Sequence, residues 1–593
     1  RAVNGRIALE NGQFAFSNLR GVSGRIRLTD VDGSYDYSPA SPGVLQLHAR
    51  GDADLGELRE QAQRGLLPAE FAKLVLSVQA LGGRGKFDIA LTRPADSKPR
   101  AAGKVALESA RLQWDQYVLT DINGDFAFTP TEIKTDKVRA LISGSPVEVR
   151  LAVKNYGADD GVFDLAVDSP GVKAGIVSRL LLETGSIQDP GIVRGSVHYR
   201  GSFNDKQDRK FTGNLELLNV QLATHPLLQP LRQLNGKISI DESGIEFQDM
   251  KGLLVGFAAS ASGRWRYAQK PQLIFDFTAP NLDITYLISQ IDPEPGDFYD
   301  NLQAEGRIAL GQGRINNFEF TDSKSNLILD RRMWRFSNLT LRAGGGAGSG
   351  PLTVVHKPDT LGIIAEPRAK NVPIAVFLRW FDISNAEITG TVDLTGKFDT
   401  AGKGNAERKR NLNGAFNLKI ADGTIYRMRI LVQLLNVLDL SRWFTFQLPD
   451  LSKQGIRFRA ITGDFKVASG VYSTDNLLVD SDDLRMTGAG KIDVPGDEID
   501  FVVAVRPFAG IDAAITQIPL LGRGIAAIKN SFLVASFNIR GRIDDPTITP
   551  APLGTLSEMF WGVLGIPKSL IPFGGDADAQ KEVPQDQLSA PSR

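Results

Sequence analysis

The chain has 593 residues, 42% of them hydrophobic and 23% charged, and its 68 Lys and Arg residues balance 68 Asp and Glu residues. Zero net charge argues against a nucleic-acid-binding protein, because such proteins need a basic surface field. The sequence has no cysteine, which excludes disulfides and thiolate metal sites and suits an envelope compartment where stray thiols oxidise.

One short phrase returns at long intervals along the chain. Residues 122–128 combine an apolar residue, Asn-Gly and an apolar–polar alternation, and the phrase recurs at 234–240, at 461–467 with Thr-Gly, and more loosely at 412–418. Long internal repeats of strand-type units predict an array that grows along one axis. Such an array offers a continuous surface, so we look for function on a long apolar face.

The first elements in chain order are a strand and two helices. Residues 5–9 alternate and predict a strand, whereas 55–62 and 69–76 have the period of short helices. No Met or leader precedes the first strand, so we expect a fragment whose N-terminal part is missing. No stretch reaches the roughly 18 consecutive apolar residues of a membrane-spanning helix.

The middle of the chain repeats a block of about five strands followed by a short helix. The clearest block has a helical period at 281–288, and similar blocks end at 172–182 and 372–381. Period-two runs with short Gly-containing spacers are typical of an antiparallel meander. The sequence therefore predicts a mostly β protein, an elongated antiparallel array with short crossover helices. The five strands of the clearest block are expected at 236–240, 245–248, 253–259, 263–267 and 273–277.

The C-terminal third contains segments of other kinds. Residues 401–410 are expected to form a loop or linker, and the helix predicted at 429–438 is apolar on most sides, which favours burial over lining a lipid-accessible cleft. Residues 555–570 predict an amphipathic segment that either docks on a membrane interface or caps the last strand. The polar tail at 574–593 is expected to be disordered. The membrane or cap residues are Met559, Phe560, Trp561 and Leu564.

No motif indicates catalysis, a metal or a cofactor. The four histidines, among them His48 and His198, lie far apart and in no zinc-binding frame. The glycine-rich run 344–350 lacks the Lys-Ser/Thr ending of a phosphate loop, and 30–33 lacks the full ladder of calcium ligands. We therefore expect a protein that is not an enzyme and needs no cofactor.

Residues 412–550 carry a resemblance to a known family. Asn413-Gly414-Ala415-Phe416 and Ala421-Asp422-Gly423-Thr424-Ile425 come first, then the helix 430–438, then Ile461-Thr462-Gly463-Asp464-Phe465 and Gly488-Ala489-Gly490-Lys491-Ile492-Asp493. Ile518-Pro519-Leu520-Leu521-Gly522 follows, and Gly541 to Pro546 closes the series. In this order the motifs resemble the C-terminal region of the AsmA-like family of bacterial envelope proteins, and its YhdP-like branch in particular.

The resemblance implies a fold, a place and a function. It implies a repeating β-groove, a curved sheet with an apolar trough, tied to the inner membrane by an N-terminal helix absent here and reaching across the periplasm. It implies a bridge-like carrier of phospholipid between the inner and outer membranes of a Gram-negative envelope. The expected regions are groove blocks at 1–385, an AsmA-like C-terminal region at 386–550, an amphipathic segment at 551–573 and the tail at 574–593.

An apolar groove can replace the bilayer for an acyl chain, because each buried methylene contributes roughly 0.8 kcal/mol. We expect a monomer whose partners are phospholipid and the two membranes or their proteins, with no nucleic acid. The alternative is a non-catalytic structural or assembly factor of the envelope with a closed β core, which has the same alternation. Side-chain parity predicts the following groove residues: Phe126, Phe128, Ile238, Ile240, Phe247, Leu273, Phe275, Phe277, Phe465 and Val467.

Overall fold

The computed structural model divides the chain into two compact units, each described by itself below. Unit 1 is Arg1–Pro280 with Tyr286–Gly306, and unit 2 is Asn281–Thr285 with Arg307–Arg593. The structure describes residues 3–10, 12–37, 43–65, 75–76, 78–94, 100–114, 117–156, 160–181, 187–188, 190–205, 208–223, 227–267, 272–291, 303–357, 359–380, 388–426, 455–482, 484–507 and 534–551.

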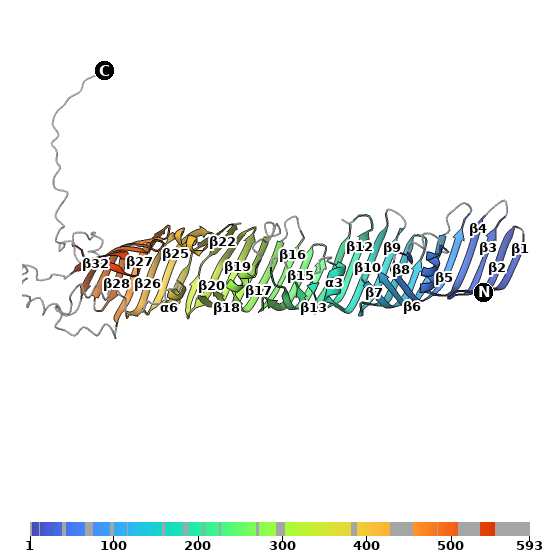
Figure 1. Ribbon diagram of the computed structural model, residues 1–593, viewed down its shortest axis with the longest axis horizontal. Helices are drawn as coiled ribbons and strands as arrows, with labels where there is room; N and C mark the ends of the chain where they lie inside the picture. Colours follow the sequence, from blue (N-terminus) through green and yellow to red (C-terminus); the bar gives the residue numbers. More distant parts are fainter. Residues whose placement is uncertain are drawn as a thin grey trace, which may run out of the picture. The chain divides into compact units, whose positions relative to one another are not determined.

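Unit 1 is built from long strands that follow one another in chain order (Figure 1). Its helices are α1 (Leu55–Gln63), α3 (Ala174–Leu181) and most of α4 (Ile284–Ser289), whose first two residues belong to unit 2. Its strands are β1 (Val3–Glu10), β2 (Gln13–Ser23), β3 (Ile26–Asp36), β4 (Val44–Asp54), β5 (Ala80–Arg93), β6 (Arg100–Trp114), β7 (Tyr117–Phe128), β8 (Glu132–Ile142), β9 (Ser145–Lys154), β10 (Val162–Lys173), β11 (Ile187–Gln188), β12 (Ile192–Ser202), β13 (Lys210–Leu222), β14 (Leu231–Asp241), β15 (Gly244–Leu254), β16 (Phe257–Arg266) and β17 (Gln272–Asp283).

Unit 2 has the same construction. Its helices are α6 (Ile374–Trp380) and α7 (Asn405–Arg410). Its strands are β18 (Gln303–Ile315), β19 (Phe318–Asp330), β20 (Met333–Ala343), β21 (Gly346–Ser349), β22 (Leu352–Lys357), β23 (Thr360–Ala365), β24 (Arg368–Pro373), β25 (Thr391–Gly402), β26 (Asn413–Ile425), β27 (Ile456–Ala468), β28 (Val471–Ser481), β29 (Leu484–Asp493), β30 (Glu498–Pro507), β31 (Ala535–Arg542) and β32 (Pro546–Pro550).

Successive strands pair as antiparallel hairpins, which confirms the predicted mostly β fold. In unit 1, β13 pairs with β14, β14 with β15, and β15 with β16, all antiparallel. Where a helix interrupts the meander, the strands on either side of it still pair, as β10 and β12 do around α3. The helices are therefore crossovers added to a continuous sheet, as the block pattern predicted.

Bulges in the middle of the strands explain the repeated Asn-Gly phrase. Ser109 has a left-handed backbone with φ of 48°, and the pairing of β6 with β7 shifts register there. Asn123, in the repeated phrase, accepts the backbone N–H of Ser109 at 2.9 Å and donates to the carbonyl of Asp121 at 2.7 Å. The Asn side chain thus satisfies the groups that the bulge leaves unpaired, and bulges bend a strand and increase its twist.

The two faces of the sheet in unit 1 differ in chemistry. One face carries cross-strand ion pairs, such as Arg150–Asp168 at 2.9 Å and Arg194–Glu216 at 3.3 Å. The other face carries alternate apolar side chains, as strands with one buried face require. We call this second face the apolar face.

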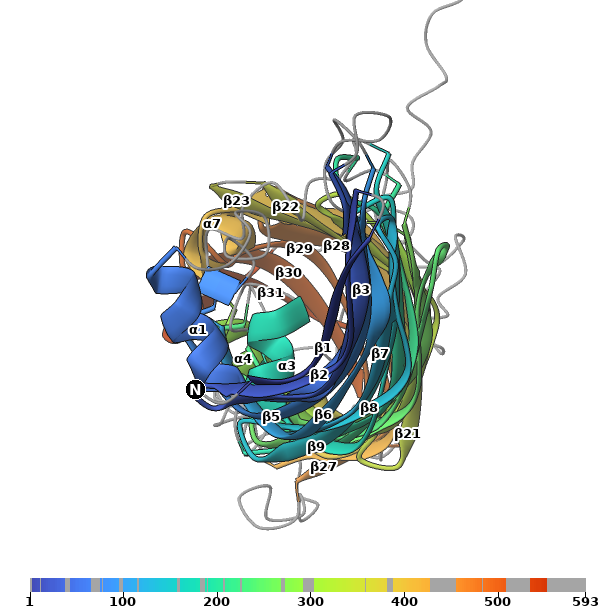
Figure 2. The ribbon, with the colours of Figure 1, turned by 90° about the vertical axis from the view of Figure 1, so that its right-hand side faces the viewer.

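Short helices pack on the apolar face at one end of the strands. Leu55 of α1 joins a buried cluster with Ile122 and Val138, and α3 contributes Ala174 to a cluster with Leu217. Figure 2 shows β1 to β9 bent, with α1 and α3 on their concave side. The core of unit 1 therefore lies between these helices and one end of the strands.

Several predicted elements differ from the structure or lie outside it. Strand β17 runs on to Asp283 before α4 begins, and 401–410 contains α7 instead of only a loop. The predicted segments at 429–438, 555–570 and 574–593, with Met559, Phe560, Trp561 and Leu564, lie outside the described residues. None of the helices that the structure describes is long and apolar enough to cross a membrane.

Candidate functional site: the apolar face

The strand register places the predicted residues of β14 to β17 on one face. Ile238 lies opposite Phe247, Phe247 opposite Gly263, and Gly263 opposite Phe275. Directly opposed residues of antiparallel strands point to the same face. By the same rule, Ile240, Leu273 and Phe277 join them through Ile245, Trp265 and Ala261.

The rings of Phe247 and Phe275 each cover a glycine of a neighbouring strand. A Cβ on Gly263 would lie 2.7 Å from the Phe247 ring, and a Cβ on Gly306 would lie 2.7 Å from the Phe275 ring. Only glycine leaves space for a ring to lie across the neighbouring strand. The rings of Phe247 and Phe275 therefore lie close against the neighbouring strands.

The other predicted residues of unit 1 lie on the same kind of surface. Phe126 is opposite Val105 and packs against the cluster under α1. Phe128, two residues further along β7, is opposite Gly103 on β6 and Ile133 on β8. Both Phe rings are half-buried.

The apolar face of unit 1 has a covered and an uncovered end. At the covered end, below α1 and α3, Ile122 is 8% exposed and Leu217 is 5% exposed. At the opposite strand ends lies a row of half-buried or exposed rings that sequence patterns did not identify. Phe163 contacts Tyr199 at 4.9 Å and Phe203 at 5.3 Å between ring centroids, and Phe203 is 44% exposed. The protein's own helices thus cover only part of this face.

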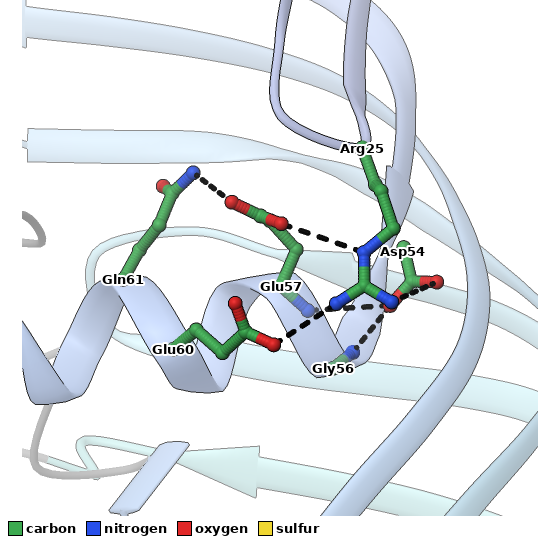
Figure 3. A network of polar contacts seen from close by, with 6 residues as sticks. All are labelled: Arg25, Asp54, Gly56, Glu57, Glu60 and Gln61. Atoms are coloured by element: carbon green, nitrogen blue, oxygen red, sulfur yellow. Dashed lines mark hydrogen bonds and ion pairs between the residues drawn. The ribbon is translucent and has the colours of Figure 1, made fainter.

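Helix α1 is held at the covered end by packing and by charge. Asp54 caps its first turn, accepting from Gly56 N at 2.9 Å and Glu57 N at 3.2 Å. Arg25, in the turn between β2 and β3, reaches the carboxylates of Asp54, Glu57 and Glu60, the last at 3.0 Å (Figure 3). These exposed ion pairs orient the helix, while burial of Leu55 supplies more of its stability.

Unit 2 repeats this division. Helix α6 packs through Ile374 and Phe377 on a buried cluster of β25 to β27. Towards the other ends of these strands, Phe465 lies opposite Phe416, and the two rings stack at 4.9 Å. Of the predicted pair in β27, Phe465 is half-buried, but Val467 is only 4% exposed.

On the face opposite the apolar face, which we call the outer face, neighbouring cations lower the pKa values of carboxylates. Hydrogen bonds from Lys210 and then Arg200 hold the pKa of Glu242 below its usual value. Lys137, followed by Arg139, lowers the pKa of Glu148 in the same way. Both sets of pairs are exposed, and Glu242 lies in the turn between β14 and β15. The described residues contain no cluster of three or more His, Asp or Glu that could hold a metal ion.

Comparison with known proteins agrees with the motifs of the C-terminal region. Residues 369–548 match the family model described as YhdP protein. The intermembrane phospholipid transporter YhdP of Escherichia coli (strain K12) is 25% identical over 153 residues, covering 23% of this chain and 12% of the relative. No solved structure matches the chain. The C-terminal region of this chain is YhdP-like, as the sequence motifs predicted.

Proposed function

We propose that this chain carries phospholipid along its apolar face, as part of a non-catalytic bridge between the inner and outer membranes of a Gram-negative envelope. The observation that carries the proposal is the shared face of Ile238, Phe247 and Phe275, which the helices leave partly uncovered. The similarity of residues 369–548 to the YhdP family supports it. We further propose that the chain works as a monomer in the periplasm.

The proposed groove consists of the residues that the sequence pattern predicted for the apolar face. The physics of lipid transfer along it is simple. An acyl chain that leaves a bilayer loses roughly 0.8 kcal/mol for each methylene exposed to water. Half-buried apolar side chains such as Ile240 and Trp265 can replace the lipid neighbours, so the acyl chain slides without passing through water. Such transfer needs no reacting group, because the groove only lowers the barrier for movement.

A second candidate function rests on the C-terminal strands of unit 2. There Phe501, Val503 and Ile539 are 5%, 6% and 3% exposed and form a buried cluster of β30 and β31. A closed core of this kind favours a structural or assembly role for this part of the chain. The two roles differ in whether phospholipid occupies the apolar face.

The test uses neighbouring residues on opposite faces of β17. Phe275 and Phe277 lie on the apolar face, whereas Ile274 is 47% exposed on the outer face. Phe275→Asp with Phe277→Asp is expected to stop transfer of labelled phospholipid between vesicles, and Ile274→Asp to leave it unchanged. Undiminished transfer by a folded double variant, or a purified protein that neither contains nor extracts phospholipid, would contradict the proposal.

A further inference from the structure

A basic helical turn stands between β25 and β26 in unit 2. Residues 401–410 contain Lys403, Arg408, Lys409 and Arg410 against a single acid, Glu407. The four cations give this segment a local charge of +3 in a chain whose net charge is zero. Such a concentration of one sign attracts anions.

Helix α7 lies on the apolar side of β25. The Thr400 hydroxyl donates to the backbone oxygen of Arg408 at 2.6 Å, and Thr400 shares a face with Phe398, two residues before it. A Cβ on Gly402 would lie 2.9 Å from the Cβ of Glu407, so the helix packs directly on this strand end. Figure 2 shows α7 beside the β22–β23 hairpin, and β23 pairs with β25.

An aromatic row follows α7 on the same face. Phe398 contacts Phe416 at 5.6 Å, and Phe416 contacts Phe465 at 4.9 Å and Tyr472 at 6.3 Å. All four rings are half-buried, so part of each ring stays accessible. A cationic rim next to an apolar row has the polarity of a phospholipid, whose anionic phosphate adjoins its acyl chains.

The cations of this rim keep their charges available. The Glu407 carboxylate is occupied by the backbone N–H of Lys403 at 2.8 Å, and the Arg408 guanidinium donates to Gly402 O at 3.4 Å and to Asn405. Lys403, Lys409 and Arg410 are exposed, and within the described ranges none of them forms an ion pair. Arg408 thus holds the helix in place, and the other three cations face solvent.

We propose that Lys403, Lys409 and Arg410, the basic rim, bind the phosphate of a phospholipid whose acyl chains lie on the row of Phe398, Phe416 and Phe465. The inference rests on the proposed function and adds a headgroup site to it. Arg and Lys recognise phosphate through charge-assisted hydrogen bonds, with Arg able to make two at once. The site faces water, so salt weakens it.

The experiment compares two short-chain lipids, of which only one carries a phosphoglycerol headgroup. Binding of dioctanoylphosphatidylglycerol and of dioctanoylglycerol to the whole chain is measured by calorimetry. The variant K403Q/K409Q/R410Q removes the basic rim, and K324Q/K370Q/K419Q removes the same charge from exposed positions on other strands of unit 2. Circular dichroism checks that both variants are folded.

The wild-type chain is expected to bind the phosphate-bearing lipid about tenfold more tightly than dioctanoylglycerol, since exposed charge contacts are individually weak. The rim variant is expected to lose this preference and the control variant to keep it. A rim variant with the wild-type preference would overturn the site. Binding of neither lipid by the wild type would instead overturn the proposed function, and equal binding of both would overturn the headgroup site alone.

Two further arms identify the source of the phosphate. Inorganic phosphate is expected to compete only weakly, and competition as strong as that of the lipid would show a free-anion site and overturn the proposal. Sedimentation with phosphatidylglycerol vesicles tests contact with a membrane surface. If the rim variant lost vesicle binding yet kept its preference for the single lipid, the rim would be a membrane contact and the proposal would be wrong.

Discussion

The side-chain oxygen of Asn235 accepts the backbone N–H of Asn219 at 3.0 Å, and its amide group donates to the carbonyl of Gln233 at 2.6 Å. Asn219 and Gln233 have φ of 52° and 53°, in the left-handed region. One side chain thus joins two bulges on neighbouring strands. At another copy of the repeat, Asn413 accepts the N–H of Ser469 at 3.0 Å, in the turn between β27 and β28.

Replacing this Asn is expected to loosen the bulges. Asn235→Ala leaves the N–H of Asn219 and the carbonyl of Gln233 without their partner, which costs about 1–2 kcal/mol. Asn235→Asp keeps the acceptor for the N–H of Asn219 but places a carboxylate oxygen beside the carbonyl of Gln233, so it should loosen the bulge at Gln233 and spare the one at Asn219. Hydrogen exchange of β13 and β14 measures the change. Equal protection in Asn235→Ala and the wild type would show that the side chain does not support the bulges.

The sequence could predict the apolar face because apolar and polar residues alternate within each half of a strand, on either side of a bulge. Residues 273–277 already show which side chains belong together, and the register places them so. The strand ends were misjudged because bulges at residues such as Asp249 break the period while the strand continues. Four of the five predicted strands therefore correspond to parts of strands of ten or more residues. The prediction of a strand at 253–259 was wrong, because the turn at Val255 and Gly256 divides it between β15 and β16.

Other parts of the site depend on register and could not be predicted. The Phe163–Tyr199 contact joins β10 to β12 across α3, and no local pattern specifies that pairing. Helix α7 was missed because its six residues follow glycines that are typical of a loop. Its concentrated charge was visible in the sequence, but its position over the Phe398 row was not.

Packing is expected to hold α1 more strongly than charge. Leu55→Ala removes a side chain that is 6% exposed and should cost about 2–5 kcal/mol. Arg25→Gln breaks ion pairs of a side chain that is 55% exposed and should cost no more than about 1 kcal/mol. Hydrogen exchange of α1 and β5 in the two variants compares the two contributions. A larger effect of Arg25→Gln would show that the ion pairs, not burial, anchor the helix.

The outer face is expected to lose stability in acid. The pKa of Glu242 is lowered from 4.5 by Lys210 and then Arg200, so its contribution is complete above pH 4.5 and disappears as the pH falls through the lower folded pKa. Melting temperatures should therefore be level near neutral pH and fall below about pH 4.5. Glu242→Gln should make this acid decline shallower. An unchanged decline would exclude a contribution from this pair.

Tyr472 offers a spectroscopic probe of the aromatic row. Burial raises the pKa of its phenol above 10.0, and the ring contacts Phe416. An acyl chain placed on this row would exclude more water and raise the pKa of Tyr472 further. Ultraviolet titration with and without phospholipid, with Tyr472→Phe identifying the signal, measures the shift. If saturating lipid left the pKa of Tyr472 unchanged, the acyl chain would not cover this ring.

The central claim is that phospholipid occupies the apolar face, and neighbouring positions on β14 test it most directly. Ile240 is half-buried on the apolar face, and Ser239 is exposed on the other. A photoreactive aromatic residue is placed at either position, and the irradiated protein is analysed by mass spectrometry. The account predicts phospholipid adducts at position 240 and none at 239. Equal labelling of both positions, or none at 240, would contradict it.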